Sequence, residues 1–194
     1  MKLVTEFYLR NDVVAISREL LGKVLCTNIN GVRTEAIITE TEAYAGIADK
    51  ASHAYGDRRT KRTEPMYGPG GTAYVYLCYG IHHLFNVVTN DEGVPHAVLV
   101  RAGKPVEGLD EILLRRNRTK VDKTLMGGPG TVSQALGIKT DMTGTSLRGR
   151  RIWIEDRGMT VLDKDISVGP RVGVDYAEED AARPYRFALD ALPE

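Results

Sequence analysis

The chain has 194 residues, and its 26 basic and 26 acidic side chains give a formal net charge of zero. This length suits one domain, predicted to span residues 1–194, and the 20 glycines favour a β-rich, loop-rich body over a helical bundle. No apolar run approaches the ~18 residues that a membrane span needs, and the N-terminus lacks the apolar segment of a signal peptide, so we expect neither a membrane protein nor a secreted one.

The first part of the chain predicts one helix, a hairpin and a long loop. Apolar residues at helical spacing follow Asn11, which we expect to cap the helix, and Gly22 stands where a C-terminal glycine belongs. Asn30-Gly31 is a strong signal for a two-residue hairpin. The predicted elements are a helix over 12–21, strands over 23–30 and 32–44, and a polar, basic loop over 45–71. A long ordered loop in a compact domain is often functional.

The rest of the chain predicts further strands and two helices. Aromatic and β-branched residues dominate the strands, and Gly-containing turns separate them. The predicted strands cover 72–79, 84–89, 96–102, 151–155, 160–162 and 172–174, and the helices cover 109–117 and 130–136. Together these elements predict an α+β fold: a single domain with a curved antiparallel β-sheet surrounded by helices and long loops.

Charge is distributed unevenly along the chain. Residues 50–151 carry 16 Lys and Arg against 9 Asp and Glu, a balance of +7; the remaining residues carry 10 against 17, a balance of −7. The basic residues cluster at 58–62, 115–120 and 148–151. Each cluster alone is typical of a solvated surface, but three in one part of the chain favour contacts with phosphate groups.

Metal and nucleotide sites lack their usual sequence signatures. His82 and His83 would face opposite sides of a strand, and no neighbouring residues complete a ligand set, so we expect no metal site. Neither a phosphate-binding loop nor a dinucleotide-binding fingerprint is present. Cys26 and Cys78 lie in apolar, strand-like segments and indicate two buried thiols in a reducing compartment.

Glu40, Glu42 and Tyr44 share one face of the predicted strand, because they are two residues apart. A solvent-facing strand end would explain the two carboxylates. A carboxylate in a partly desolvated cleft could instead take a proton from water. Strand-mates about 7 Å apart are also compatible with the carboxylate pair of an inverting glycoside hydrolase. The pattern alone leaves all three interpretations open.

Tyrosines crowd the strand over 72–79. Tyr74 and Tyr76 share a face, which core packing would explain, whereas Tyr79 precedes Gly80 at a hairpin tip. An aromatic side chain on an exposed tip suits a wedge pushed between base pairs from the minor groove. Arg101 ends an apolar strand, where an arginine usually has a carboxylate or phosphate partner. That partner could make a structural ion pair, or Arg101 could orient Glu42.

These motifs, in their order and spacing, resemble the alkyladenine (3-methyladenine) DNA glycosylases of the Mpg type. The resemblance runs from Arg18 to Val174, nearly the whole chain. The matching segments are ETEAY at 40–44, a histidine at 53, YVYLCYG at 74–80, an asparagine at 86, LVRA at 99–102, and GPG with QALGI between 128 and 138. The resemblance implies a base-excision-repair enzyme that flips alkylated or deaminated purines out of DNA: 3-methyladenine, 7-methylguanine, hypoxanthine or ethenoadenine.

The resemblance implies a catalytic role for two residues. Glu42 matches the base that activates the water attacking the deoxyribose C1′, and Arg101 matches the arginine that helps to hold that water and the carboxylate. The matched motifs contain no lysine acting as a Schiff-base nucleophile. This implies a monofunctional enzyme that leaves an abasic site without cutting the strand, and that needs no metal or organic cofactor.

The other matched residues imply contacts with DNA. Tyr44, His53 and Tyr76 match the side chains that sandwich the flipped base, and Asn86 matches the asparagine that disfavours the exocyclic amine of guanine. Tyr79 matches the intercalating tyrosine that fills the gap left in the base stack. An alkylated purine such as 3-methyladenine is positively charged, so it leaves readily and stacks well between electron-rich rings.

One departure from the family pattern lies after its GPG motif, where Lys-Leu is common and this chain has Thr131-Val132. An expected basic contact is therefore missing from that position. We expect a monomer that acts on double-stranded DNA containing damaged purines, with no membrane association. Its expected place is the cytoplasm of a bacterial-type cell, and the nucleoid when it acts on DNA.

Two rival functions remain on the same residues. A non-catalytic nucleic-acid-binding module on this scaffold would need neither Glu42 nor Arg101. A sugar-processing hydrolase using Glu40 with Glu42 should have exposed tryptophans in its cleft, whereas Trp153 is the only tryptophan. The position of Glu42 in the motif shared with the glycosylases separates it from Glu40, which we interpret as a structural residue.

Overall fold

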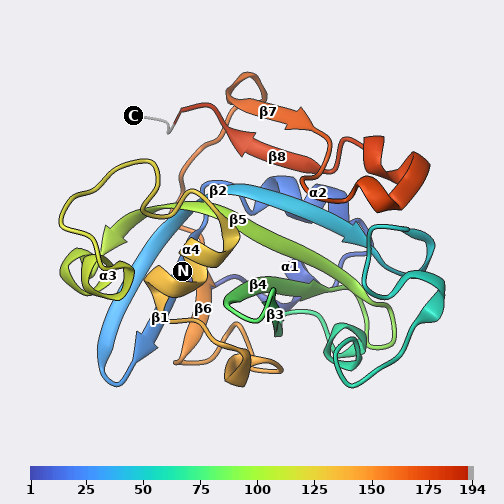
Figure 1. Ribbon diagram of the computed structural model, residues 1–194, viewed down its shortest axis with the longest axis horizontal. Coiled ribbons are helices and arrows are strands. Elements are labelled where there is room, and N and C mark those ends of the chain that lie inside the picture. Colours follow the sequence, from blue (N-terminus) through green and yellow to red (C-terminus); the bar gives the residue numbers. More distant parts are fainter. Residues whose placement is uncertain (192–194) are drawn as a thin grey trace.

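A computed structural model describes residues 1–191, so the last three residues of the predicted domain lie outside the described residues. Within this range, the strands form one antiparallel sheet in the order β3-β4-β5-β2-β1-β6, and β8 pairs with both β2 and β7 (Figure 1). The strands are β1 Val24–Ile29, β2 Val32–Ala45, β3 Ala73–Cys78, β4 His82–Thr89, β5 His96–Glu107, β6 Ile152–Glu155, β7 Ile166–Gly169 and β8 Arg186–Leu189.

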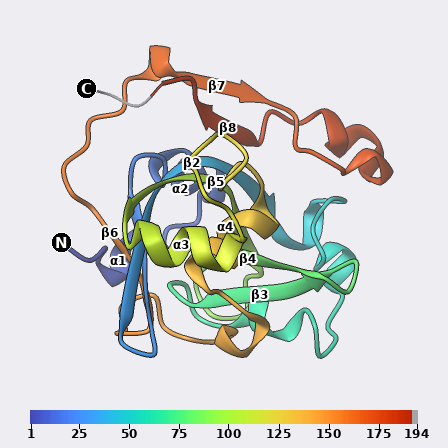
Figure 2. The same ribbon diagram turned by 60° about the vertical axis from the view of Figure 1, so that its left-hand side comes forward.

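Helices and loops surround this sheet, which is curled rather than flat (Figure 2). The α-helices are α1 Thr5–Tyr8, α2 Val13–Glu19, α3 Leu109–Arg116 and α4 Pro129–Leu136. Short 3₁₀ segments cover Gly46–Ala48, Tyr55–Asp57, Glu64–Tyr67, Thr140–Met142, Asp163–Asp165 and Asp175–Ala182. The predicted α+β class with a curved antiparallel sheet is confirmed. None of the helices in residues 1–191 has the length and apolarity to cross a bilayer.

Alternate residues of the central strands face opposite sides of the sheet, as the period of a strand requires. On one side, Val75, Phe85 and Val98 join the main core, which also takes in apolar residues of α2, α3 and α4. The residues between them, such as Tyr74 and Asn86, line a cavity on the other side. Because the side chains of a strand alternate, one face of the sheet packs against the core and the other face lines the cavity.

The pairing of β2 with β5 contains two bulges near its middle. Thr39 is an extra residue in β2, and Arg101 is one in β5. The core-facing positions of β2 change parity across Thr39, from Ile38 before the bulge to Ala43 after it. Glu42 consequently lies on the face away from the core, and Arg101 is aimed at it. Bulges commonly re-aim side chains next to active sites.

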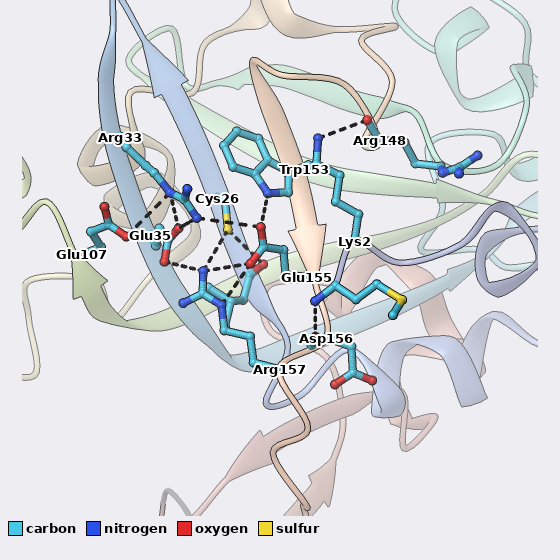
Figure 3. Close-up of polar contacts among 12 residues, drawn as sticks. Lys2, Cys26, Arg33, Glu35, Glu107, Arg148, Trp153, Glu155, Asp156 and Arg157 are labelled. Carbon is cyan, nitrogen blue, oxygen red and sulfur yellow. Dashed lines mark hydrogen bonds and ion pairs between the residues drawn. The ribbon is translucent and has the colours of Figure 1, made fainter.

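A polar cluster joins β1, β2 and β6 near the N-terminal end of β2 (Figure 3). Glu35 is fully buried there and forms ion pairs with Arg33 and Arg157. Arg33 also lies over the ring of Trp153, 5.4 Å from its centroid. Burial raises the pKa of the Cys26 thiol, and the Glu35 carboxylate raises it further. Cys26 is therefore an inert thiol of a structural cluster.

Several predicted boundaries are corrected by the structure. Asp12 rather than Asn11 caps α2, since its carboxylate accepts from the Ala15 N–H at 2.9 Å. Strand β4 already begins at His82, and β5 continues to Glu107, five residues past the predicted end. The thiol of Cys26 is buried as expected, whereas Cys78 is only half-buried.

Two short predicted strands are wrong. Residues 160–162 and 172–174 form no strand, while the hairpin of β7 and β8 and the short helix α1 were not predicted. A strand needs a neighbour for its backbone groups. The N–H of Val172 instead donates to a side chain, Glu42, and Val161 packs against Gly22. An alternating apolar pattern does not reveal whether the backbone of a short segment pairs with a neighbouring strand or with a side chain.

Candidate active site

A cavity of about 490 Å³ opens on the sheet face that points away from the main core. Its floor comes from alternate residues of β3, β4 and β5. The loop over 45–71, the segment over 172–176 and the start of α4 supply the walls. The predicted site residues that line it are Tyr44, His53, Tyr76, Tyr79, Asn86 and Arg101. The fold thus gathers residues from widely separated parts of the chain around one hollow.

Glu42 lies directly behind the wall of this cavity, with a fully buried side chain. Its Oε1 accepts the main-chain N–H of Val172 at 2.7 Å. Its Oε2 accepts the hydroxyl of Tyr44 at 2.8 Å and Nη1 of Arg101 at 3.3 Å. All three partners line the cavity, whereas Glu42 does not. Three donors aimed at one carboxylate stabilise its ionised form.

Arg101 bridges the two carboxylates of β2. Its Nε donates to Glu40 at 3.2 Å while its Nη1 donates to Glu42. Glu40 also accepts Nη1 of Arg186 at 3.1 Å. Glu40 and Glu42 therefore share a face, as their spacing predicts. Glu40 is engaged by two arginines, which suits a structural role, and Arg101 both forms an ion pair and contacts Glu42.

Tyr44 is held as a hydrogen-bond donor. Burial raises the pKa of its phenol well above the ordinary value, and the neighbouring Glu42 carboxylate raises it further. The hydroxyl therefore keeps its proton at neutral pH and donates it to Glu42. The guanidinium of Arg171 lies over the Tyr44 ring, 4.9 Å from its centroid.

His53 of the wall and Tyr74 and Tyr76 of the floor form one aromatic group in the cavity. The rings of His53 and Tyr76 meet edge to face with centroids 4.7 Å apart, and His53 Nδ1 lies 3.0 Å from the Tyr74 hydroxyl. Burial, followed by the positive charges of Arg62 and Arg58, lowers the pKa of His53 to about 4. The ring is thus neutral at physiological pH. Arg62 also lies over Tyr76, 4.9 Å from the ring centroid.

The amide of Asn86 has a defined orientation. Its Nδ2 donates to the carbonyl oxygens of Tyr74 and Leu84, both at 3.2 Å. Because both partners are acceptors, the amide nitrogen must face them. The side chain is therefore a rigid part of the cavity lining.

Tyr79 occupies the tip of the β3–β4 hairpin and is 91% exposed. Ile81 beside it is 71% exposed, so the tip carries two large apolar side chains. Tyr79 and Gly80 both have left-handed backbone, with φ of 50° and 73°. That conformation is unfavourable for a tyrosine and is typical of residues held for a function. The predicted position of Tyr79 in the turn is confirmed.

The two histidines of the hairpin point apart, as predicted. His82 lies on the cavity side against Gly130 of α4, and His83 Nδ1 accepts the N–H of Thr140 at 3.3 Å. Within residues 1–191, no three metal-ligating side chains lie together. Thr131, at the departure from the family pattern, caps α4: its Oγ1 accepts from Gly128 N and donates to Gly128 O.

Some residues of the site were missed by the sequence interpretation. Val172 contributes only its backbone N–H, which no side-chain motif reveals. Asp49 and Arg171 form a fully buried ion pair behind the cavity. Tyr176, which is 65% exposed, also lines the cavity. Among these residues only Arg171 carried a signal in the sequence, because it is a charged residue of the segment GPRVGV at 169–174, where the resemblance ends.

The three basic clusters are partly neutralised within the protein. Arg59 pairs with Glu64, and Arg151 pairs with Asp141. Arg115 is half-buried and pairs with Glu111 one helical turn away. Among the predicted basic residues, Arg62 reaches the cavity itself.

Comparison with known proteins gives a consistent result. The family model described as "Methylpurine-DNA glycosylase (MPG)" matches residues 6–193. A Chlamydia abortus protein named "Putative 3-methyladenine DNA glycosylase" is 47% identical over 96% of this chain and 97% of its own length. Proteins of the same name from Bacillus cereus and Clostridium acetobutylicum are 43% and 44% identical, over 100% and 97% of this chain and 98% and 94% of their own lengths.

Proposed function

The chain belongs to the methylpurine-DNA glycosylase family, and we propose that it removes damaged purines from double-stranded DNA by hydrolysing the N-glycosidic bond. Membership confirms the resemblance carried by the motifs. The observation that best supports the proposed chemistry is Glu42, a buried carboxylate held by three donors directly behind an aromatic cavity. The name shared by the relatives points to 3-methyladenine as a substrate, with 7-methylguanine, hypoxanthine and ethenoadenine as further members of the class.

In this proposal, Glu42 takes a proton from a water molecule that attacks C1′ of the flipped nucleotide. Arg101 holds the carboxylate and the water in place. The sugar develops positive charge as the base departs, and an anionic carboxylate stabilises that charge. The released base leaves an abasic site. The scheme uses side chains and water alone, and it contains no lysine nucleophile that would cut the strand.

The cavity is proposed to receive the flipped purine. Tyr44 lines one side of the cavity, and His53 of the wall meets Tyr76 of the floor, so aromatic faces are available for a planar base. Asn86 would collide with the exocyclic amine of guanine, so undamaged guanine would not fit the cavity and would not be removed. Tyr79, on the exposed tip, would fill the gap in the duplex. All of these groups come from one chain, so we propose that the protein acts as a monomer. Its partner would be the DNA of the bacterial nucleoid.

The test is release of hypoxanthine from a labelled duplex under single-turnover conditions. Glu42→Gln should abolish release while leaving binding of the duplex intact, because the amide cannot accept the proton. Glu35→Gln is the matched control, since it neutralises another buried carboxylate of β2 away from the cavity. Undiminished release by Glu42→Gln would remove Glu42 as the base. Strand cleavage without alkali treatment would contradict a monofunctional reaction.

A further inference from the structure

Asp49 and Arg171 form an ion pair in which both side chains are fully buried. Nη1 and Nη2 of the arginine contact the two carboxylate oxygens, with 2.8 Å between Nη2 and Oδ1. Neither residue lines the cavity. Burial opposes ionisation of Asp49, yet the Arg171 hydrogen bonds hold the pKa of its carboxyl below the ordinary value. The pair is therefore charged in the folded protein.

The pair connects three segments that meet behind the site. Arg171 donates to the main-chain carbonyls of Ala43 in β2 at 2.9 Å and of Asp180 at 3.2 Å. Asp49 accepts the N–H of Ala45 at 2.9 Å and, through its other oxygen, that of Ala51 at 3.1 Å. The ion pair thus contacts the end of β2, the following loop and the C-terminal segment at once.

Two of the three donors to Glu42 depend directly on Arg171. The next residue in the chain, Val172, supplies the N–H that binds Oε1. The guanidinium stacks over Tyr44, whose hydroxyl binds Oε2. Any displacement of Arg171 therefore moves both contacts together.

Stability alone explains this arrangement poorly. A buried ion pair loses much of its Coulombic gain to desolvation, and apolar replacements are often as stable. Within the described residues, the buried Nε of Arg171 also has no hydrogen-bond partner, which adds a further cost. An energetically inefficient pair next to a reactive carboxylate is the pattern expected of a functional support.

We propose that Asp49 and Arg171 are positioning residues, which hold the Val172 N–H and the Tyr44 hydroxyl against Glu42 so that the carboxylate keeps one orientation behind the cavity. The inference rests on the proposed function, because it assigns these residues to the same reaction. Neither residue touches the substrate, so their effect passes through Glu42.

The experiment compares Asp49→Asn and Arg171→Lys with wild type in single-turnover release of hypoxanthine at increasing enzyme concentration, so that the limiting rate and the binding of the duplex are measured separately. Both variants should be slowed by about 100-fold, because a displacement of roughly 1 Å in a reactive group costs that much. The loss should fall on the limiting rate at saturating enzyme, because it comes from a displaced Glu42 carboxylate and not from weaker binding. Duplex binding should change little.

The matched control is Glu35→Gln, which removes the charge of another fully buried carboxylate from its ion pair with Arg157, away from the cavity (Figure 3). It should lower the melting temperature to a similar degree while keeping the wild-type limiting rate. Wild-type limiting rates in folded Asp49→Asn and Arg171→Lys, or an equal loss of rate in Glu35→Gln, would overturn the proposal. If Glu42→Gln keeps full activity, the proposed function fails instead.

A measurement on the wild-type protein avoids any dependence on variants that fold. Val172 is 51% exposed and lies outside the described helices and strands, so its amide should exchange rapidly unless it is held. We expect the Val172 N–H to exchange with solvent as slowly as the amides of β2. Rapid exchange would show that the contact with Glu42 is not maintained and would overturn the proposal.

Discussion

The main-chain N–H of Val172 donates to Oε1 of Glu42 at 2.7 Å, although 130 residues separate them in the chain. The carboxylate stands near the end of β2, and its donor comes from a loop that immediately precedes the last 3₁₀ segment. A hydrogen bond from a backbone amide favours the ionised carboxylate, which is the form that can accept a proton from water. The hydrogen bonds of the carboxylate proposed as the catalytic base are thus completed by the C-terminal part of the chain.

Arg101→Lys should slow base release by about 100-fold, because a lysine cannot contact Glu40 and Glu42 with two separate nitrogens. Binding to undamaged duplex should remain near the wild-type value. Single-turnover kinetics and a gel-shift titration measure the two quantities. Arg10→Lys, in an exposed pair with Glu19, is the control and should leave the rate unchanged. A rate loss explained wholly by weaker binding would argue against an orienting role.

Tyr79→Gly should separate folding from function. Glycine adopts the left-handed backbone at this position without steric cost, so the variant should be as stable as wild type or more stable. Removing the ring should weaken capture of the flipped state by roughly 1–3 kcal/mol, the size of one stacking contact. Thermal melting and binding to a duplex with a non-hydrolysable abasic analogue test the two parts. Equal losses for damaged and undamaged duplex would make Tyr79 a general contact only.

His53 should make the protein less stable in mild acid. Its pKa is about 4 in the folded state, whereas an unfolded histidine titrates near 6.5. Between these values the unfolded chain binds a proton that the folded protein does not, so the stability conferred by neutral His53 is present above pH ~6.5 and is lost as the pH falls towards 4. Urea unfolding at pH 7 and pH 5 should show a contribution on the order of 1–2 kcal/mol. His53→Asn should remove it. A His53 ring that titrates near 6.5 by NMR would contradict this expectation.

Asn86→Ala should relax discrimination against guanine. The side chain is buried in the cavity lining and its amide is anchored by two carbonyl groups, so it cannot move aside for a larger base. Its removal opens space for the exocyclic amine of guanine. We therefore expect release of normal guanine to rise about tenfold relative to release of hypoxanthine, because relief of an unfavourable contact of about 1.4 kcal/mol changes a rate by that factor. Competition between labelled duplexes measures the ratio. An unchanged ratio would assign selectivity to another residue.

Local patterns in the chain predict a large part of this fold. The Asn30-Gly31 turn, the alternation along β3 and β4, and the helical spacing in α2 all depend on neighbours a few residues away. The same alternation places Glu40 and Glu42 on one face. Family resemblance, rather than pattern, selected Glu42 and the residues expected around it.

Tertiary structure alone decides which of these groups meet. The burial of Glu42, its contact with Val172 and the Asp49–Arg171 pair join positions more than 100 residues apart, and no local pattern encodes such distances. The predicted strand at 172–174 was wrong for the same reason, because its amide finds a carboxylate instead of a neighbouring strand. Backbone period and turn geometry are local properties, whereas the partners of a buried polar group depend on how the whole chain packs.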